Sequence, residues 1–542
     1  MKPIISLLAL FLLFSCNSEQ YADLIITNSK TYTVDESFSQ AEAFAVRDGK
    51  FIAIGTDDEI LATYTSEQIV DANGQAIVPG FIDAHCHFLG LGVNQQAVDL
   101  VGTTSFEEVV QRVVDFQKKN QLSHITGRGW DQNDWEDKRF PKKTLLDSLF
   151  PDTPISLTRI DGHAIICNQA ALDLGGVTAD SKTDGGEVVV EDGELTGVLI
   201  DNAENLVMNY WPGMSATDVT NALKKAEEIC FEYGLTTVDD AGLGPNEINL
   251  IESLQAKGEL KMRVYAMVSA SKENLDYYLE RDPLKTERLN VGSFKFYADG
   301  ALGSRGAMLR APYSDKPGHL GLMVNSLETL NETAERIAKS DYQMNTHAIG
   351  DSANHAVLAT YKRVLDGQQD RRWRIEHAQV ISPEDFDHFN NIVPSVQPTH
   401  ATSDMYWAED RLGPERVKGA YAFKQLLESY GQLALGTDFP VEQVNPFYTF
   451  YAAVARQDLE QFPEDGYQME NALSREETLK GMTIWAAHSN FEEDEKGSIE
   501  PGKFADFIML DRDIMTAPLN DIPDAKVDAT YLGGELVMQR KK

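Results

Sequence analysis

The sequence has little cysteine and little positive charge. Four of its 542 residues are cysteines, and Cys86, Cys167 and Cys230 are so widely spaced that we expect buried small side chains and no disulfide framework. Lysine and arginine number 48 against 85 aspartates and glutamates, which gives a formal net charge of -37. Nucleic acid and anionic membrane faces repel such a chain, so nucleic-acid binding is excluded, and a solubilising acidic surface is the simplest interpretation.

Long apolar runs are scarce as well, and the one that stands out lies at the N-terminus. Lys2 is followed by a nearly all-apolar stretch from Ile4 to Phe14, which fits the core of a signal peptide and is too short to span a bilayer. Leu13-Phe14-Ser15-Cys16 resembles the lipobox of bacterial lipoproteins. The resemblance implies a signal peptide over residues 1–16, a lipid anchor at Cys16 and a location in the bacterial cell envelope, outside the cytoplasm. An ordinary signal peptide is the alternative.

Strand-like pieces stand at both ends of the chain. Residues 21–78 run in short β-rich segments, among which Asp48-Gly49 is typical of a hairpin. The same style returns in Phe507-Ile508-Met509-Leu510 and in residues 529–538. We therefore predict one small β-sandwich domain that combines residues 17–78 with residues 490–542.

The middle of the chain, residues 79–489, alternates apolar strand-like runs with helical stretches. This alternation predicts βαβ units around a parallel sheet, and the number of runs is that of a TIM (β/α)8 barrel of the α/β class. A long insertion, about residues 88–217, separates the first run from the second. The eight candidate strands are Gly80–Ala84, Leu235–Asp239, Met262–Val268, Ser293–Tyr297, Gln343–Thr346, Trp373–Glu376, Val393–Gln397 and Leu433–Gly436.

Two histidines close the first candidate strand, in Gly80-Phe81-Ile82-Asp83-Ala84-His85-Cys86-His87. Residues two apart on a strand point to the same face, so His85 and His87 can share one metal ion. Such a pair also arises by chance. Its place at the C-terminal end of a barrel strand, where these barrels form their active sites, favours metal binding.

Four further residues with ligand chemistry follow at later strand ends. Strand alternation places Lys295 on the face opposite its two phenylalanine neighbours, toward the barrel interior, where a lysine must be neutralised or paired. His347, His377 and Asp438 each come at or just after the end of a candidate strand. Each residue alone has an ordinary structural explanation, but together they indicate one site.

Four other residues are candidates for substrate binding. His163 and His400 are placed to polarise a substrate or to bind an oxyanion, although a satisfied buried histidine is an equally simple explanation for each. Arg128 and Trp130 lie in the insertion, and insertions at this face commonly shape substrate pockets.

At this point the sequence resembles the amidohydrolase superfamily, in the branch of amidohydrolase family 3 that includes N-substituted formamide deformylases. The likeness covers nearly all of the chain after the signal peptide, including the stretches 295–305, 346–351 and 497–507. In that family a histidine pair on the first strand, a lysine on the fourth, histidines on the fifth and sixth and an aspartate on the eighth hold one or two metals. The corresponding residues here are His85, His87, Lys295, His347, His377 and Asp438.

The resemblance implies a metal-dependent hydrolase of C–N bonds, with an N-formyl or N-acyl amine as substrate. It implies that Lys295 is carboxylated and bridges two ions, whereas an unmodified lysine would leave a single-ion site. Imidazole and oxygen ligands favour zinc, although iron and manganese accept the same set. Metal-activated hydroxide would attack the carbonyl, and Asp438 would act as ligand and as general acid and base.

Two alternatives stay open. One is a cyclic amide hydrolase or deaminase on the same scaffold. The other is a surface lipoprotein that binds a ligand or a metal without turnover. A monomer and a homo-oligomer are both compatible with the sequence.

Overall fold

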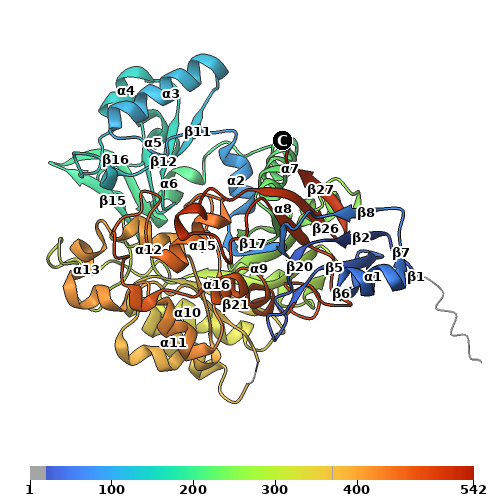
Figure 1. The fold of residues 1–542 in the computed structure, drawn as a ribbon. Coiled ribbons are helices and arrows are strands. Elements are labelled where there is room, and N and C mark those ends of the chain that lie inside the picture. Colours follow the sequence, from blue (N-terminus) through green and yellow to red (C-terminus); the bar gives the residue numbers. More distant parts are fainter. Residues whose placement is uncertain (1–19, 369, 542) are drawn as a thin grey trace, which may run out of the picture.

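The computed structural model describes residues 20–368 and 370–541 (Figure 1). The predicted signal peptide and the lipidation site at Cys16 lie outside the described residues. Within them, no helix combines the length and the apolar character needed to cross a membrane. The three cysteines in this part of the chain are buried and free, as expected.

Eight parallel strands form the centre of the molecule, and they are the eight that the sequence predicts, with ends shifted by a few residues. Their residues are almost all buried because the strands face a packed interior on one side and helices on the other. The strands fit a TIM barrel, with β19 (Leu284–Lys285) added to the fourth. In spatial order they are β10 (Phe81–Cys86), β17 (Leu235–Leu243), β18 (Arg263–Ser269), β20 (Leu289–Tyr297), β21 (Gln343–Ala348), β22 (Arg374–His377), β23 (Val393–Val396) and β24 (Ala434–Leu435).

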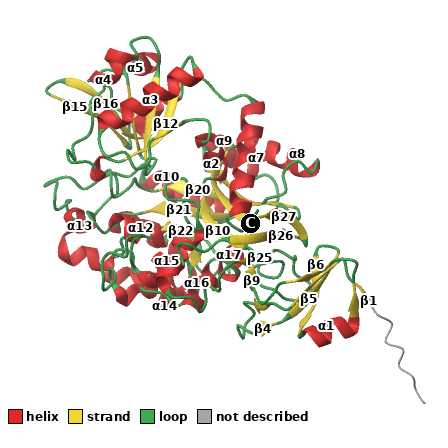
Figure 2. Ribbon diagram, turned by 45° about the horizontal axis from the view of Figure 1, so that its top comes forward, coloured by secondary structure: helices red, strands yellow, loops and turns green. Residues whose placement is uncertain are grey.

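The helices between these strands cover the sheet (Figure 2). In α7 (Ala216–Glu232), Ser215 and Asp218 form a capping box that satisfies the first backbone N–H groups, and Leu223 and Cys230 lie on the buried face. The other helices after the barrel strands are α8 (Pro245–Ala256), α9 (Lys272–Tyr278), α10 (Leu327–Ile337), α11 (Asp351–Val364), α12 (Pro398–Asp404), α13 (Ala408–Arg416), α14 (Phe423–Tyr430), α15 (Pro446–Ala455), α16 (Arg475–Gly481) and α17 (Ile484–Ser489).

The insertion after β10 begins with α2 (Phe88–Asn94) and builds a mixed sheet with its own hydrophobic core. Helices α3 (Phe106–Asn120), α4 (Thr144–Leu149), α5 (Gln169–Gly175) and α6 (Asn205–Met208) accompany it, and it stands apart from the strands of the two termini in Figure 1. The strands of this sheet, in order, are β11 (Val98–Asp99), β12 (Ile125–Trp130), β13 (Ile155–Arg159), β14 (Ala164–Cys167), β16 (Glu194–Asp201) and β15 (Gly186–Glu191).

The two chain ends contribute to neighbouring sheets. One sheet has the order β6 (Lys50–Gly55), β5 (Ala43–Arg47), β2 (Leu24–Thr27) and β8 (Ile69–Asp71). Asp48 and Gly49 connect β5 to β6 with positive φ at both, as the hairpin signal predicts. The other sheet runs β27 (Glu535–Gln539), β26 (Val527–Leu532), β25 (Phe507–Leu510), β9 (Ala76–Pro79), β3 (Lys30–Tyr32) and β4 (Gln40–Ala41).

One hydrophobic cluster spans these two sheets, with Phe44 from the first packed edge-on against Phe507 from the second. Beside them, the short α1 (Asp57–Thr63) leads into β7 (Tyr64–Thr65), which pairs with β1 (Gln20–Tyr21). Segments from opposite ends of the chain therefore share a core.

Candidate metal and substrate site

A cavity of about 690 Å³ opens where the barrel strands end, between the barrel and the insertion. The barrel contributes five of the six predicted residues at its strand ends, with the sixth, His85, fully buried behind them, and the insertion contributes a wall of charged side chains. Among the lining residues are His87, Lys295, His347, His377, His400 and Asp438 from the barrel side, and Arg128, Arg159, Asp161, His163, Asp201 and Glu204 from the insertion.

The main chain joins the first and last barrel strands at this cavity. The backbone N of Asp438 donates to the carbonyl O of His85 at 2.8 Å, and the N of His87 donates to the O of Phe439 at 2.7 Å. These two bonds place the carboxylate of Asp438 beside the histidine pair.

Backbone conformation marks the same positions. Asp438 and His377 have φ values of 60° and 74°, in the left-handed region that side chains other than glycine rarely adopt. Buried Asp83 supports the neighbouring turn by accepting from the N and Oγ1 of Thr437 at 3.0 and 2.7 Å. Unfavourable dihedrals held in place by surrounding contacts are typical of functional sites.

The His85 and His87 rings are oriented by their Nδ1 atoms. Nδ1 of His85 lies 2.6 Å from Glu376 Oε2, and Nδ1 of His87 lies 3.0 Å from the carbonyl O of Ala241, so each Nδ1 donates a hydrogen. The Nε2 atoms then face Asp438 Oδ1 at 3.8 and 3.3 Å. A nitrogen lone pair and a carboxylate oxygen that face each other need a proton or a cation between them. These three side chains fit a metal ion.

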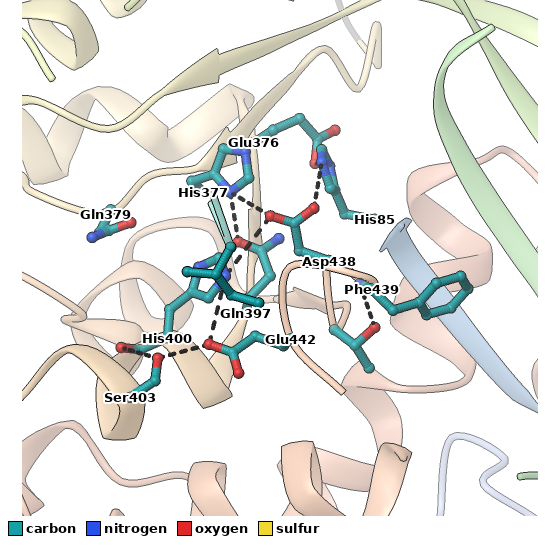
Figure 3. A network of polar contacts seen from close by, with 12 residues as sticks. His85, Glu376, His377, Gln379, Gln397, His400, Ser403, Asp438, Phe439 and Glu442 are labelled. Carbon is teal, nitrogen blue, oxygen red and sulfur yellow. Dashed lines mark hydrogen bonds and ion pairs between the residues drawn. The ribbon is translucent and has the colours of Figure 1, made fainter. Parts of the chain in front are cut away.

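A second group that could hold an ion shares Asp438 and adds His377 and His400 (Figure 3). His377 Nδ1 lies 2.8 Å from Gln397 Oε1, which orients the ring. His400 Nε2 lies 3.8 Å from Asp438 Oδ2 and 4.0 Å from Glu442 Oε1, and it is buried without a hydrogen-bond partner among the described residues. The sequence suggested His400 for substrate binding. In the structure His400 lines the cavity, and it also lies beside the predicted metal ligand Asp438.

His347 lies beside these groups without meeting their spacing. Its ring centroid is 4.6 Å from that of His377, and its Nε2 is 3.5 Å from the carbonyl O of Gly300. On the other side the ring of His163 follows at 5.0 Å. His347 therefore connects the barrel histidines with the histidine that the insertion supplies.

Lys295 faces the barrel interior, as strand alternation predicts. Its Nζ lies 3.0 Å from His85 Nε2, while Phe294 and Phe296 are buried in the hydrophobic core. Burial lowers the pKa of Lys295 to about 8. A lysine with this pKa has a reactive neutral fraction near neutral pH.

The pKa shifts at the site keep His347 and His377 neutral and Asp438 ionised. Burial lowers the pKa values of His347 and His377 well below the usual range, and the positive charges of neighbouring groups add to this effect. Burial alone would raise the pKa of Asp438, but contact with His87 and the nearby His85 ring outweighs it and holds that pKa well below its usual range. Neutral imidazoles and an ionised carboxylate are the forms that metal binding requires.

The insertion places two of its three predicted residues in the cavity wall. Arg128 donates from Nη2 to the O of Ile160 at 2.8 Å, and its Nε is buried without a hydrogen-bond partner among the described residues. His163 Nδ1 lies 2.7 Å from Asp201 Oδ1, and although burial opposes it, this contact raises the pKa of His163 to about 9. Both side chains therefore present positive charge to the cavity.

Trp130 does not belong with them, and this prediction is corrected. Its side chain is fully buried in the core of the insertion sheet, where Nε1 donates to the carbonyl O of Leu157 at 2.8 Å. Alternating side chains of β12 point to opposite faces of the sheet, so Arg128 and Trp130 would share a face in a regular strand. The register shift between residues 128 and 130, with Gly129 at φ 115°, breaks that alternation.

Four residues that contact the histidines of the site were not predicted from the sequence: Glu376, Gln397, Glu442 and Asp201. Glu376 had a readable signal, because Arg374 and Glu376 are two charged residues at alternate positions of a strand that should be buried. The other three are in loops or at the ends of elements and carry no comparable pattern. Gln397, Glu442 and Asp201 belong to the site only because the fold places each of them beside a histidine.

Comparisons with known proteins show similarity over nearly the whole chain. A model of the amidohydrolase family matches residues 68–538. Protein LONG AFTER FAR-RED 3 of Arabidopsis thaliana is 32% identical over 536 residues, covering 95% of this chain and 91% of that protein. An N-substituted formamide deformylase of Arthrobacter pascens is 26% identical over 551 residues, covering 96% and 99%.

A solved structure is similar over the same extent. The crystal structure of an uncharacterized metal-dependent hydrolase from Pyrococcus horikoshii OT3 superposes with a TM-score of 0.75 at 27% identity, covering 91% of this chain and 98% of that one. The match to the family model begins at β8 and extends over the barrel, the insertion and the strands at the C-terminal end, whereas β1 to β7 lie before it. The chain belongs to the amidohydrolase family.

Proposed function

We propose that this protein is a metal-dependent hydrolase that cleaves a C–N bond, with an N-formyl or N-acyl amine as its substrate. The observation that carries the proposal is the convergence of His85 Nε2 and His87 Nε2 on the buried carboxylate of Asp438, beside a cavity large enough for a small molecule. Membership of the amidohydrolase family supports the reaction class. The likeness to an N-substituted formamide deformylase supports the substrate class.

In this proposal His85, His87 and Asp438 hold one divalent ion. A second ion would be held by His377 together with His347 or His400, and by Lys295 if its Nζ is carboxylated. The mixture of imidazole and carboxylate donors favours zinc. When bound, such an ion supplies an activated water and polarises the substrate carbonyl.

Side chains of the protein then transfer the proton and stabilise the developing negative charge. Asp438, ionised and buried, accepts a proton from the attacking water and delivers it to the nitrogen of the leaving amine. The cationic ring of His163 is aimed at the cavity and can donate a hydrogen bond to the carbonyl oxygen as negative charge develops. Arg128 offers further donors to the substrate from the same wall.

The test combines metal analysis of the purified protein with turnover on a panel of N-formyl amines, N-acyl amines, cyclic amides and aminated rings. We expect stoichiometric zinc, loss of activity with a chelator, and release of formate or another carboxylate. Release of ammonia from aminated rings, or ring opening of cyclic amides, would favour the alternative reactions on this scaffold. Metal binding without turnover on any substrate would favour the binding lipoprotein.

The lipid anchor is a separate proposal. We propose that Cys16 is lipidated, becomes the mature N-terminus and holds the enzyme to the bacterial cell envelope outside the cytoplasm. Mass spectrometry of the N-terminal peptide, in the wild type and in Cys16→Ser, tests it. An unmodified chain that still carries residues 1–15 would rule it out.

A further inference from the structure

The inside of the barrel contains a buried charged pair that the proposed reaction does not use. Arg374 and Glu376 occupy alternate positions of β22 and point to the same side of the strand, into the barrel interior. Both side chains have no solvent exposure. They reach β10, which is not a neighbour of β22 in the sheet.

Both residues act on the segment that carries His85. Glu376 Oε2 lies 2.6 Å from His85 Nδ1, and Arg374 Nη1 donates to the carbonyl O of Ala84 at 3.1 Å. One side chain therefore fixes the ring, and the other fixes the peptide immediately before it. Arg374 Nη1 also lies 3.9 Å from Glu376 Oε1, which offsets the charge of that carboxylate.

Asp239 of β17 supplies a second carboxylate to Arg374. Asp239 Oδ2 accepts from Arg374 Nη1 at 3.0 Å, and Asp239 Oδ1 accepts from Asn490 Nδ2 at 2.8 Å. Asn490 also contacts Arg374 Nη2. The guanidinium is held from two sides, so the side chain of Glu376 has a fixed charged neighbour.

We infer that Glu376 is the positioning residue of His85. By accepting from Nδ1–H it selects the tautomer whose Nε2 carries a lone pair, aims that Nε2 at Asp438, and increases its basicity toward a cation. The inference rests on the proposed metal-dependent function. Glu376 is fully buried and does not line the cavity, so it acts through His85.

Zinc affinity tests this role, because a purely structural carboxylate would not change it. Zinc is titrated against a competing chelator into apo wild type, Glu376→Gln and Glu376→Ala, with thermal unfolding of each apo protein measured in parallel. Loss of a carboxylate partner of a ligating histidine weakens metal binding by about 10- to 100-fold. We expect about 10-fold for Glu376→Gln, which keeps an acceptor oxygen and the side-chain shape, and about 100-fold for Glu376→Ala.

A matched control is Asp506→Asn. Asp506 forms a buried bidentate pair with Arg263, at 2.7 and 3.0 Å, outside the cavity. We expect this variant to lose thermal stability and to bind zinc as the wild type does. Wild-type zinc affinity in folded Glu376→Gln would overturn the inference alone. Failure of the wild type itself to bind zinc would overturn the proposed function, and the inference with it.

Discussion

The barrel strand ends and the insertion wall face the same cavity but are built differently. At the strand ends, His85, Lys295, His347, His377 and Asp438 follow from a repeating rule, since parallel barrel strands all end on one face. In the insertion, Arg128 and His163 reach the cavity, whereas Trp130 is turned into a separate core. The barrel therefore places side chains by periodicity, and the insertion places them by local irregularities.

This difference suggests that the strand ends and the insertion have different functions. Most of the positions at the barrel strand ends are buried, and they carry the metal and proton chemistry in our proposal. In the insertion, the position of Arg128 depends on the register shift in β12, and that of His163 depends on the turn between the antiparallel strands β13 and β14, so both can vary without disturbing the barrel. We expect changes at the strand ends to abolish turnover, and changes in the insertion to alter stability or substrate affinity.

The largest effect is expected at the junction of β10 and β24. In Asp438→Asn the carboxamide cannot accept the proton from water, so kcat should fall by about 10²- to 10⁴-fold, the usual contribution of a general base. Zinc content should stay near that of the wild type. Steady-state kinetics with metal analysis measure both, and equal turnover in the variant would refute the role of Asp438.

A different loss is expected inside the insertion core. Trp130→Ala removes a fully buried ring and should cost about 3–5 kcal/mol of unfolding free energy. The kcat of the folded protein should change little, since Trp130 does not line the cavity. Tyr210→Ala, which removes an exposed insertion ring, is the control, with an expected change within about 0.5 kcal/mol. A kcat loss in folded Trp130→Ala would return this residue to the substrate site.

The pair of His163 and Asp201 should give a pH-dependent contribution. Because the pKa of His163 rises from 6.5 to about 9 on folding, its stabilisation is complete below pH 6.5 and is lost as pH rises through 9. The full effect is on the order of 3 kcal/mol. Denaturant unfolding of wild type and Asp201→Asn from pH 6 to pH 10 should show a stability gap that closes at high pH. A gap that is constant or widens would contradict the assignment.

The smallest effect is expected at Arg128. Arg128→Gln removes one charged set of donors from the cavity wall, so KM should rise about 10-fold while kcat changes little. Arg112→Gln, on the outer helix α3 where Arg112 pairs with Glu108, is the matched control and should leave KM unchanged. An unchanged KM in Arg128→Gln would mean that the insertion closes the cavity without contacting substrate.

Much of the fold and of the candidate site could be predicted from the sequence. The eight strands were predictable because each is a short apolar run bounded by turn residues, and the residues at their ends were predictable because parallel strands share one end. Glu376 was within reach of the same reasoning but was missed. His400 was predicted to bind substrate, but its closeness to Asp438 was not predicted. His400 lies on α12, after β23, where strand periodicity does not apply.

The sequence by itself determined which residues stand at the barrel strand ends, since strand periodicity and the alternation of strands with helices are local properties of the chain. Only the tertiary structure decided which atoms meet. The contact of Glu376 with His85 crosses the barrel interior between residues 291 positions apart, and the burial of Trp130 follows from one shifted register in β12. Such contacts depend on how distant segments pack, and no local pattern encodes that packing.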